Sequence, residues 1–238
     1  MSKANVTAAE RPYHHGDLQR AIVNAALEVL SETQSTEFSL RELARRAGVT
    51  HNAPYKHFAD KRELLAAVSA VGFDLLAKRL TNAMQGQTSP RARLFAIARD
   101  YVRHGVENPA LYRLMFGGYL TGPDDERPAI EIAAAEKTKA LLADAIAQGA
   151  LGRPLPKTPR NEQKIAAGIL IFWSLMHGLT LLLVDRLVGP SRKTDELSES
   201  VLQGMLEGLA KRIPALPAGV WVGPREPAKY KALVRAKS

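Results

Sequence analysis

Apolar residues recur at helical spacing along most of the chain. The first such stretch begins near Asp17 and ends near Glu32, with apolar positions three or four residues apart. A second stretch begins at Ser39, and a third follows Asp60 and reaches about Gln85. No stretch has the alternation of apolar and polar residues that indicates a strand. The pattern predicts an all-α protein of about nine helices.

Residues that begin or end helices divide the later part of the chain. A capping residue followed by proline predicts a helix start, and glycine or proline groups predict stops. The predicted starts are Ser89-Pro90, Asn108-Pro109 and Thr158-Pro159, and the predicted stops are Gly117-Gly118, residues 149–152, Gly189-Pro190 and Pro214.

Four parts follow from these boundaries. We expect a disordered arm over residues 1–16 and an N-terminal head of three helices over residues 17–60. A C-terminal helical bundle is expected over residues 61–213, with residues 61–85 as its connecting helix. Residues 214–238 form a basic, proline-rich tail.

Within the head, the stretch from Ser39 to Lys61 has the pattern of a helix-turn-helix. Ser39 and Glu42 stand three residues apart, as in a capping box, and begin the first helix. Gly48 ends that helix where a left-handed residue is needed. The second helix of such a motif enters the major groove of DNA.

A proline lies inside this second helix. With Thr50 or His51 as the expected N-cap, Pro54 falls in the first turn, where its missing N–H has no helical partner to lose. Ala53 and Phe58 are expected to face inward. The proline favours a short helix capped at His51, or a tightened first turn.

Polar side chains on the outer side of the motif are candidates for DNA contacts. An amide such as that of Asn52 pairs well with adenine, and the Lys56 ammonium suits guanine or phosphate. Phosphate contacts position a protein on DNA without specifying sequence. The candidates for phosphate contact are Ser39, Tyr55, His57 and Lys61. Arg41 and Arg45 are candidates for either base or phosphate contact. Thr50, His51, Asn52 and Lys56 complete the set of predicted DNA-contacting residues.

The net charge of +9 adds less to this picture than its size indicates. Residues 211–238 contain seven basic residues and one acidic residue, whereas the rest of the chain contains 26 and 23. The excess of basic over acidic residues therefore lies mainly in the tail and not in the predicted helix-turn-helix.

Twenty residues without a formal charge, Ile165 to Val184, are long enough to cross a membrane. Gly168, Ser174 and His177 dilute this run, and an ionisable histidine is costly inside a bilayer. A helix that is apolar all round is equally expected when its own domain covers one side and a second subunit covers the other. We therefore expect a dimer core, with a membrane-anchored helix-turn-helix regulator as the alternative.

Aromatic and methionine side chains gather on two helices of the bundle. Trp173 and His177 are four residues apart, and so share a helix face. Such side chains suit an adaptable apolar cavity for a small molecule, although the same set is equally compatible with an ordinary core. The candidate ligand-binding residues are Tyr112, Met115, Phe116, Tyr119, Trp173 and His177.

No known catalytic motif is present, and the chain has no cysteine. The adjacent His14 and His15 lack the spacing of a structural metal site. We expect no enzyme activity, no metal and no cofactor, with a helical small-molecule-binding enzyme as a second alternative. The N-terminus lacks the apolar core of a secretory signal, which favours the cytoplasm.

The sequence LRELARRAGVTHNAPYKHFADKRELL resembles the N-terminal signature of the tetracycline-repressor (TetR) family, with its A-x-x-A-G-V turn, its Y-x-H-F and a following lysine. The run from Trp173 to Gly178 resembles the W-x-x-x-H-G motif of one subgroup. The resemblance implies a homodimer that binds a palindromic double-stranded operator and usually represses transcription. It further implies that residues 17–60 bind DNA, and that residues 61–213 bind a small-molecule effector and dimerise.

Overall fold

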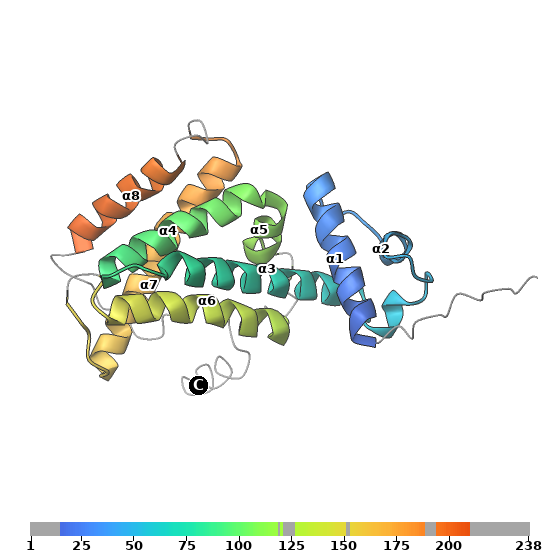
Figure 1. The fold of residues 1–238 in the computed structure, drawn as a ribbon, viewed down its shortest axis with the longest axis horizontal. Coiled ribbons are helices and arrows are strands. Elements are labelled where there is room, and N and C mark those ends of the chain that lie inside the picture. The colour runs from blue at the N-terminus through green and yellow to red at the C-terminus, as the bar shows by residue number, and fades with distance from the viewer. Residues whose placement is uncertain (1–14, 119, 121–126, 151–152, 189–193, 210–238) are drawn as a thin grey trace, which may run out of the picture. The chain divides into compact units, whose positions relative to one another are not determined.

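The computed structural model describes residues 15–118, 120, 127–150, 153–188 and 194–209 of the protein (Figure 1). These residues contain eight α-helices, one 3-10 helix and no strand, which confirms the all-α prediction and comes close to the expected nine helices. The helices are α1 His15–Thr33, α2 Leu40–Arg46, α3 Lys61–Met84, α4 Pro90–Glu107, α5 Pro109–Phe116, α6 Ala129–Ala147, α7 Pro159–Val184 and α8 Thr194–Leu209, and the 3-10 helix η1 is Pro54–Lys56.

The chain divides into two compact units after Leu64, near the start of α3. The first unit contains α1, α2 and η1, and α2 packs against both of the others. Its core is built from the apolar stripes of these elements, and Ile22, Leu43 and Phe58 are all at most 1% exposed. The expected arm and tail lie largely outside the described residues.

The predicted start and end of α2 are confirmed. The Ser39 hydroxyl accepts a hydrogen bond from the Glu42 N–H at 3.1 Å. Gly48 has a φ of 68°, a left-handed conformation that costs a glycine little. This turn lets the Val49 N–H donate to the Ala44 carbonyl at 2.9 Å.

The second helix of the motif is not capped at Thr50 or His51, so that cap prediction is wrong, whereas the alternative of a tightened turn agrees with the structure. Pro54 has no N–H to bond to the Thr50 carbonyl four residues earlier, and that carbonyl accepts from the Ala53 N–H at 2.9 Å instead. Only the 3-10 turn η1 follows, with Pro54 at its first position. Ala53 and Phe58 are buried, as predicted.

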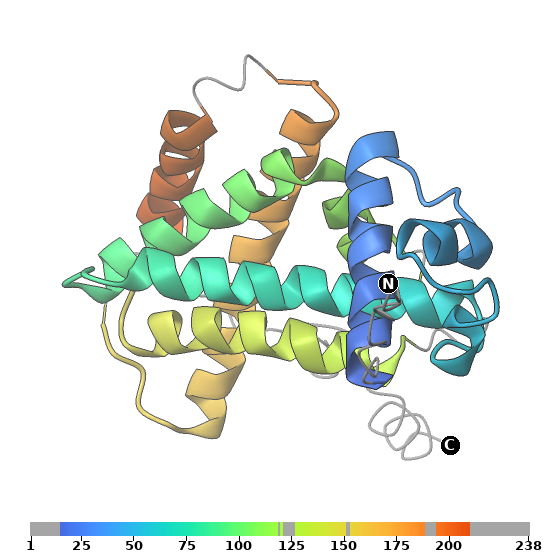
Figure 2. The ribbon, with the colours of Figure 1, turned by 45° about the vertical axis from the view of Figure 1, so that its right-hand side comes forward.

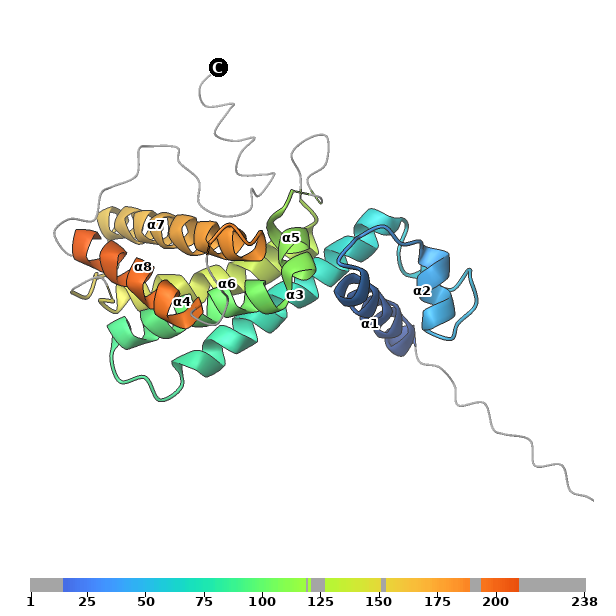
Figure 3. The same ribbon diagram turned by 90° about the horizontal axis from the view of Figure 1, so that it is seen from above.

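The second unit is a bundle around α4. Helix α4 packs against α5, α6, α7 and α8, and α7 also packs against α6 and α8. Figures 1 and 2 show α7 crossing behind α4 and α6, and Figure 3 shows α7 and α8 on one side of the bundle. Gly105 permits the close approach of α4 to α7, because a Cβ there would overlap the Thr180 Cγ2 methyl.

The proline-marked helix starts are correct, but one expected cap is not. The hydroxyls of Ser89 and Thr158 accept from the N–H groups three residues later, at 3.1 and 3.2 Å. Asn108 makes no such bond. Its side-chain amide donates backward to the His104 carbonyl at 3.0 Å, so it serves the end of α4 and not the start of α5.

Helix α7 contains the long uncharged run and is apolar and long enough to cross a membrane, a test that core helices of soluble proteins also pass. Within the chain, 39% of its most apolar window is buried. The helix ends at Val184, before the predicted stop, because Arg186 adopts a left-handed φ of 58° without being glycine. The Leu187 N–H then donates to the Leu182 carbonyl at 2.8 Å and closes the helix.

The close contact between α4 and α7 predicts that a larger residue in place of Gly105 lowers the stability of the fold. We expect Gly105→Ala to destabilise the fold by about 1–3 kcal/mol, since its Cβ would overlap Thr180 and would lie 2.9 Å from the Tyr112 ring. Gly204→Ala, also in a helix but with open space around it, is the control and is expected to be neutral or stabilising by about 0.5–1 kcal/mol. Urea unfolding measures both, and equal effects would contradict the close approach.

Candidate functional site

The first candidate site is the outer surface of the first unit between Ser39 and Lys61. Eight of the ten predicted DNA-contacting side chains are exposed there. They are Ser39, Arg41, Arg45, Thr50, His51, Asn52, Tyr55 and Lys56. The fold therefore leaves this set accessible to a partner, although the Ser39 hydroxyl also caps α2. Among the described residues of this unit, Tyr55 is the most exposed large apolar side chain, at 51%.

The other two candidates are only partly exposed. His57 is partly buried, and the Lys61 ammonium lies 5.3 Å from the centroid of the Phe38 ring, a cation–π distance. Arg46, outside the predicted set, forms an ion pair with Glu32 of α1 at 2.7 Å. That pair ties the end of α2 to α1. Arg41, Arg45 and Arg46 are all exposed on α2.

The second candidate site is a cluster of six rings in the second unit, hereafter the aromatic cluster. Its rings contact one another at centroid separations of 4.7–6.2 Å, mostly edge-on or tilted, which aromatic pairs prefer. Its members are Phe73 of α3, Tyr101 of α4, Tyr112 and Phe116 of α5, and Trp173 and His177 of α7.

Polar atoms of the aromatic cluster form a chain of hydrogen bonds. The Trp173 Nε1–H donates to the Tyr101 hydroxyl at 3.2 Å, and the Tyr101 and Tyr112 hydroxyls are 3.0 Å apart. The Tyr112 hydroxyl lies 2.6 Å from His177 Nδ1. Burial raises the pKa of both tyrosines and lowers that of His177, so all three groups are held neutral.

The structure brings together four of the six predicted ligand-binding residues. Tyr112, Phe116, Trp173 and His177 are in the aromatic cluster, and the last three are partly exposed. Met115 is fully buried, and its Sδ would lie 2.7 Å from a Cβ on Gly72, so it packs against α3. Tyr119 lies outside the described residues.

Sequence reasoning missed Tyr101 and Phe73. Tyr101 is 4% exposed and joins Trp173 to Tyr112, although 72 residues separate it from Trp173. Each residue has the helical spacing of an ordinary core position. The available signal was a hydroxyl-bearing side chain on the buried stripe of α4, which requires a polar partner.

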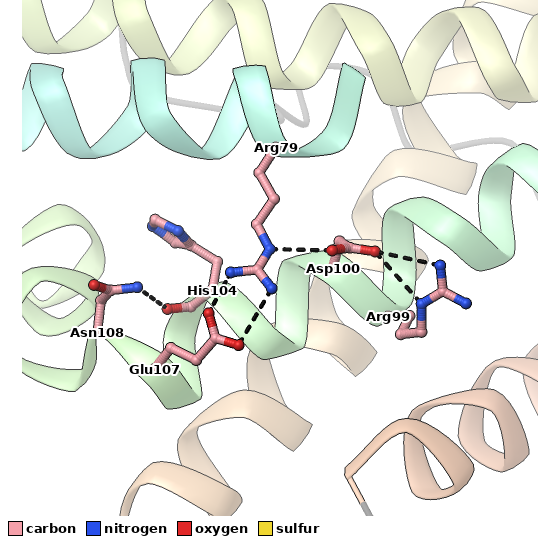
Figure 4. A network of polar contacts seen from close by, with 6 residues as sticks. All are labelled: Arg79, Arg99, Asp100, His104, Glu107 and Asn108. Atoms are coloured by element: carbon pink, nitrogen blue, oxygen red, sulfur yellow. Dashed lines mark hydrogen bonds and ion pairs between the residues drawn. The ribbon is translucent and has the colours of Figure 1, made fainter. Parts of the chain in front are cut away.

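A polar network, absent from the sequence prediction, joins α3 to α4 (Figure 4). The Arg79 guanidinium donates to Asp100 at 3.1 Å and binds both oxygens of Glu107. The hydrogen bond from Arg79 lowers the pKa of Glu107. Arg99 adds a second, longer ion pair to Asp100 at 3.4 Å.

His104 lies between Asp100 and Glu107 on α4 and is 3% exposed. No described residue bonds its Nε2. Burial lowers the pKa of His104 to about 4, and the positive charge of Arg79 adds to the shift, while Glu107 opposes it. His104 is therefore a neutral core histidine at physiological pH.

Two family models match the chain. The model described as bacterial regulatory proteins, tetR family, matches residues 22–68, and the model described as tetracyclin repressor-like, C-terminal domain, matches residues 94–205. The first match lies mostly within the first compact unit, and the second lies within the second unit.

Curated relatives align with part of the chain. The nucleoid occlusion factor SlmA of Marinobacter nauticus is 27% identical over 107 residues, 45% of this chain and 55% of that protein. The HTH-type transcriptional activator FasR of Mycolicibacterium smegmatis is 34% identical over 103 residues, 42% of this chain and 46% of that protein. The chain thus spans about half the length of the curated relatives that it matches.

Solved structures share the fold over a longer range. A Rhodococcus sp. RHA1 protein of unknown function is 30% identical with a TM-score of 0.67, and the match covers 84% of this chain and all of that one. The fatty acid degradation regulator FadR of Bacillus halodurans has 18% identity and a TM-score of 0.60, over 85% and 98% of the two chains. AibR, in complex with isovaleryl coenzyme A and operator DNA, has 22% identity and a TM-score of 0.52, over 84% and 100%.

The lowered pKa of His104 predicts an acid-dependent loss of stability. Below pH 6.5 the unfolded chain binds a proton at His104 that the folded chain excludes until about pH 4, so stability falls as the pH falls through this window. The shift corresponds to at most about 3 kcal/mol. In His104→Leu this part of the loss disappears, as urea unfolding between pH 4 and pH 7.5 measures.

Val102→Ala is the control, since Val102 is fully buried on the same helix and carries no titratable group. It is expected to lower stability by a similar amount at every pH. A slope in His104→Leu equal to that of the unmodified protein would contradict the role assigned to His104.

Proposed function

Because the chain belongs to the tetracycline-repressor (TetR) family of bacterial regulators, we propose that it is a ligand-responsive transcriptional repressor. It binds a palindromic operator as a cytoplasmic homodimer. The observation that carries the proposal is the exposed polar surface between Ser39 and Lys61, built on a helix-turn-helix. This family consists of regulators, and no enzymatic step is needed to account for either candidate site.

DNA binding is assigned to the short η1 turn and its neighbours. Tyr55 and Lys56 are exposed on η1, while Ala53 and Pro54 are buried beneath it. The buried pair fixes the turn to the core, so the exposed pair is presented rigidly. Rigid presentation supports sequence-specific contact, because only a fixed side chain discriminates between base edges.

Dimerisation is assigned to α7 and α8. Helix α7 has a mean hydropathy of 2.0 over its most apolar window, yet less than half of that window is buried within one chain. Leu182 is 41% exposed and Leu187, just beyond the helix, is 70% exposed. A second copy would cover this apolar surface, and would also set two reading heads at the spacing of successive major grooves, roughly 34–36 Å.

Effector binding is assigned to the aromatic cluster. It is formed by residues of four helices of the second unit, so a molecule bound there would contact several elements of the bundle at once. The effector releases DNA only if it prefers the non-binding arrangement. A coupling of ~1–3 kcal/mol would change operator affinity by roughly 5–150-fold. AibR, of the same fold, has been solved with both a coenzyme A ester and operator DNA, which supports one chain serving both roles.

Repression is the proposed direction of control. Relatives of the chain act in both directions, since FasR is an activator and a 29% identical Mycobacterium tuberculosis relative is a repressor. A dimer that occupies a palindrome covers the DNA from other proteins without further contacts, so repression needs no additional surface.

The reading surface makes a direct prediction. We expect Tyr55→Ala combined with Lys56→Ala to weaken specific operator binding at least about tenfold, since one good base contact contributes ~1–3 kcal/mol. Fluorescence anisotropy on a duplex selected from random DNA measures the affinity. Lys157→Ala, which removes an exposed charge from the second unit, is the control and should bind normally. Unchanged affinity of the double variant would refute the assigned reading surface.

The dimer assignment makes a second prediction. Leu182→Arg places a charge in the proposed interface and is expected to shift the protein from dimer to monomer, as light scattering after size exclusion measures. Leu75→Arg on α3 is the matched control, because Leu75 is also an exposed leucine, at 48%, but lies outside α7 and α8. If Leu182→Arg remains dimeric, or if only Leu75→Arg dissociates, the interface lies elsewhere.

A further inference from the structure

Helix α3 belongs to both compact units, because Lys61 to Leu64 lie in the first unit and the rest of the helix lies in the second. Among the described residues, α3 is in none of the closely packed helix pairs of the bundle, so its attachments there are made by side chains. Arg79 provides one attachment, to α4. A second attachment lies nearer the first unit, at Ser69, and joins α3 to α5 and α6.

The attachment at Ser69 is a line of four polar groups. The Ser69 hydroxyl donates to the Glu131 carboxylate oxygen Oε1 at 2.8 Å. The Arg127 Nη2 lies 3.6 Å from the same oxygen and donates to the Met115 carbonyl at 3.2 Å. These four groups, hereafter the carboxylate relay, run from the last turn of α5, through the first turn of α6, to α3.

The carboxylate relay is buried. Ser69, Met115 and Glu131 are fully buried, and the Arg127 side chain is 16% exposed. A buried carboxylate depends on the charged and hydrogen-bonding groups close to it, since water does not replace them when they move away. Because one carboxylate oxygen serves both Arg127 and Ser69, a displacement of the end of α5 changes the bond that holds α3 to α6.

Apolar contacts place α5 against the same part of α3. The Met115 Sδ would lie 2.7 Å from a Cβ on Gly72, so the missing side chain lets α5 reach the α3 backbone. Next to it, the rings of Phe73 and Phe116 meet edge-on with their centroids 5.2 Å apart. Since Tyr112 and Phe116 of α5 belong to the aromatic cluster, a molecule that displaces α5 acts directly on this part of α3.

Hydrogen bonds at the start of α3 connect the helix to the reading segment. The Asp60 carboxylate accepts from the Glu63 N–H at 2.8 Å, and the Glu63 carboxylate accepts from the Ala59 N–H at 2.6 Å. These reciprocal caps bind the residues that follow η1 to the first turn of α3. Because an α-helix is rigid over the short distance from Glu63 to Ser69, a displacement at Ser69 is passed on to η1.

We propose that the carboxylate relay couples the position of α5 to operator binding, with Glu131 as the residue through which Arg127 and Ser69 influence each other. The inference rests on the proposed function, since it requires operator binding, and it names the residues by which the second unit regulates the reading surface. Ser69, Arg127 and Glu131 are positioning residues, because they act through α3 and not by contact with DNA.

A double-mutant cycle in the full-length protein tests whether the carboxylate relay is connected. Ser69→Ala and Arg127→Met are measured singly and together by urea unfolding. Groups joined through one carboxylate should deviate from additivity by roughly 2–150-fold in the unfolding equilibrium constant, whereas independent sites agree within about twofold. If Arg127→Met does not fold, Arg127→Lys, which keeps the charge on a shorter reach, takes its place.

The control cycle combines Ser69→Ala with Lys137→Ala. Lys137 forms an exposed ion pair with Asp74 at 2.6 Å, which also joins α6 to α3 but lies outside the carboxylate relay. This pair of variants is expected to be additive. Additive behaviour of Ser69→Ala with the Arg127 variant would overturn the relay.

Amide hydrogen exchange tests the link to DNA. Exchange over residues 112–117 and 129–133, at the end of α5 and the start of α6, is compared with and without a selected operator duplex. Because coupling is reciprocal, the operator should change exchange there at least about fivefold, while a duplex of scrambled sequence should not. The operator effect should disappear in Ser69→Ala and persist in Lys137→Ala.

An operator effect of equal size in Ser69→Ala, or no effect in the unmodified protein bound to its operator, would overturn the coupling and leave the repressor assignment intact. Failure of the proposed function is recognised separately, because then no selected duplex binds specifically. The double-mutant cycle needs no DNA, and in that case a non-additive result would reduce the carboxylate relay to a structural contact between α5 and α3.

Discussion

The close approach of α4 to α7 is the contact on which the second unit depends. Gly105 has no side chain, so Thr180 and Tyr112 pack directly against the α4 backbone. Tyr101, one turn earlier on α4, is then near enough to bond the α7 residue Trp173. An ordinary side chain at Gly105 would separate the helices, and the hydrogen-bond chain that ends at His177 would lose its connection between them.

The structure of the first unit depends in a similar way on one residue, Pro54. Pro54 cannot join an α-helical ladder, and the reading segment is therefore a single 3-10 turn above a buried Ala53 and Phe58. Tyr55 and Lys56 project from a support that the core holds in place. In both units, the absence of one ordinary group positions the candidate site. Pro54 lacks a backbone N–H and so determines where Tyr55 and Lys56 lie, and Gly105 lacks a side chain and so determines where the aromatic cluster lies.

Local chemistry made much of the fold predictable from sequence. Ser39, Ser89 and Thr158 cap helices as their patterns indicated, because a cap depends only on residues within one turn. Arg186 misled the stop prediction, since a non-glycine residue there takes the left-handed conformation that glycine usually supplies. Asn108 was misassigned because its amide had two nearby choices and bonded backward to α4.

The candidate sites were predictable to different degrees. The residues proposed to contact DNA belong to one continuous stretch, so their exposure followed from helical periodicity around Gly48. The aromatic cluster joins four helices, and no local pattern pairs Tyr101 with Trp173 or Arg79 with Glu107. Only the tertiary fold brings these partners together, which is why Tyr101 and Phe73 were missed while Trp173 and His177, on one helix face, were found.

Selection of bound sites from random double-stranded DNA with the purified full-length protein tests the central claim most directly. The account predicts enrichment of a palindrome whose half-sites are centred about one helical turn apart, or a multiple of it. It also predicts that Tyr55→Ala with Lys56→Ala abolishes that enrichment. Recovery of no sequence above the random background, or of the same palindrome by the double variant, would contradict it.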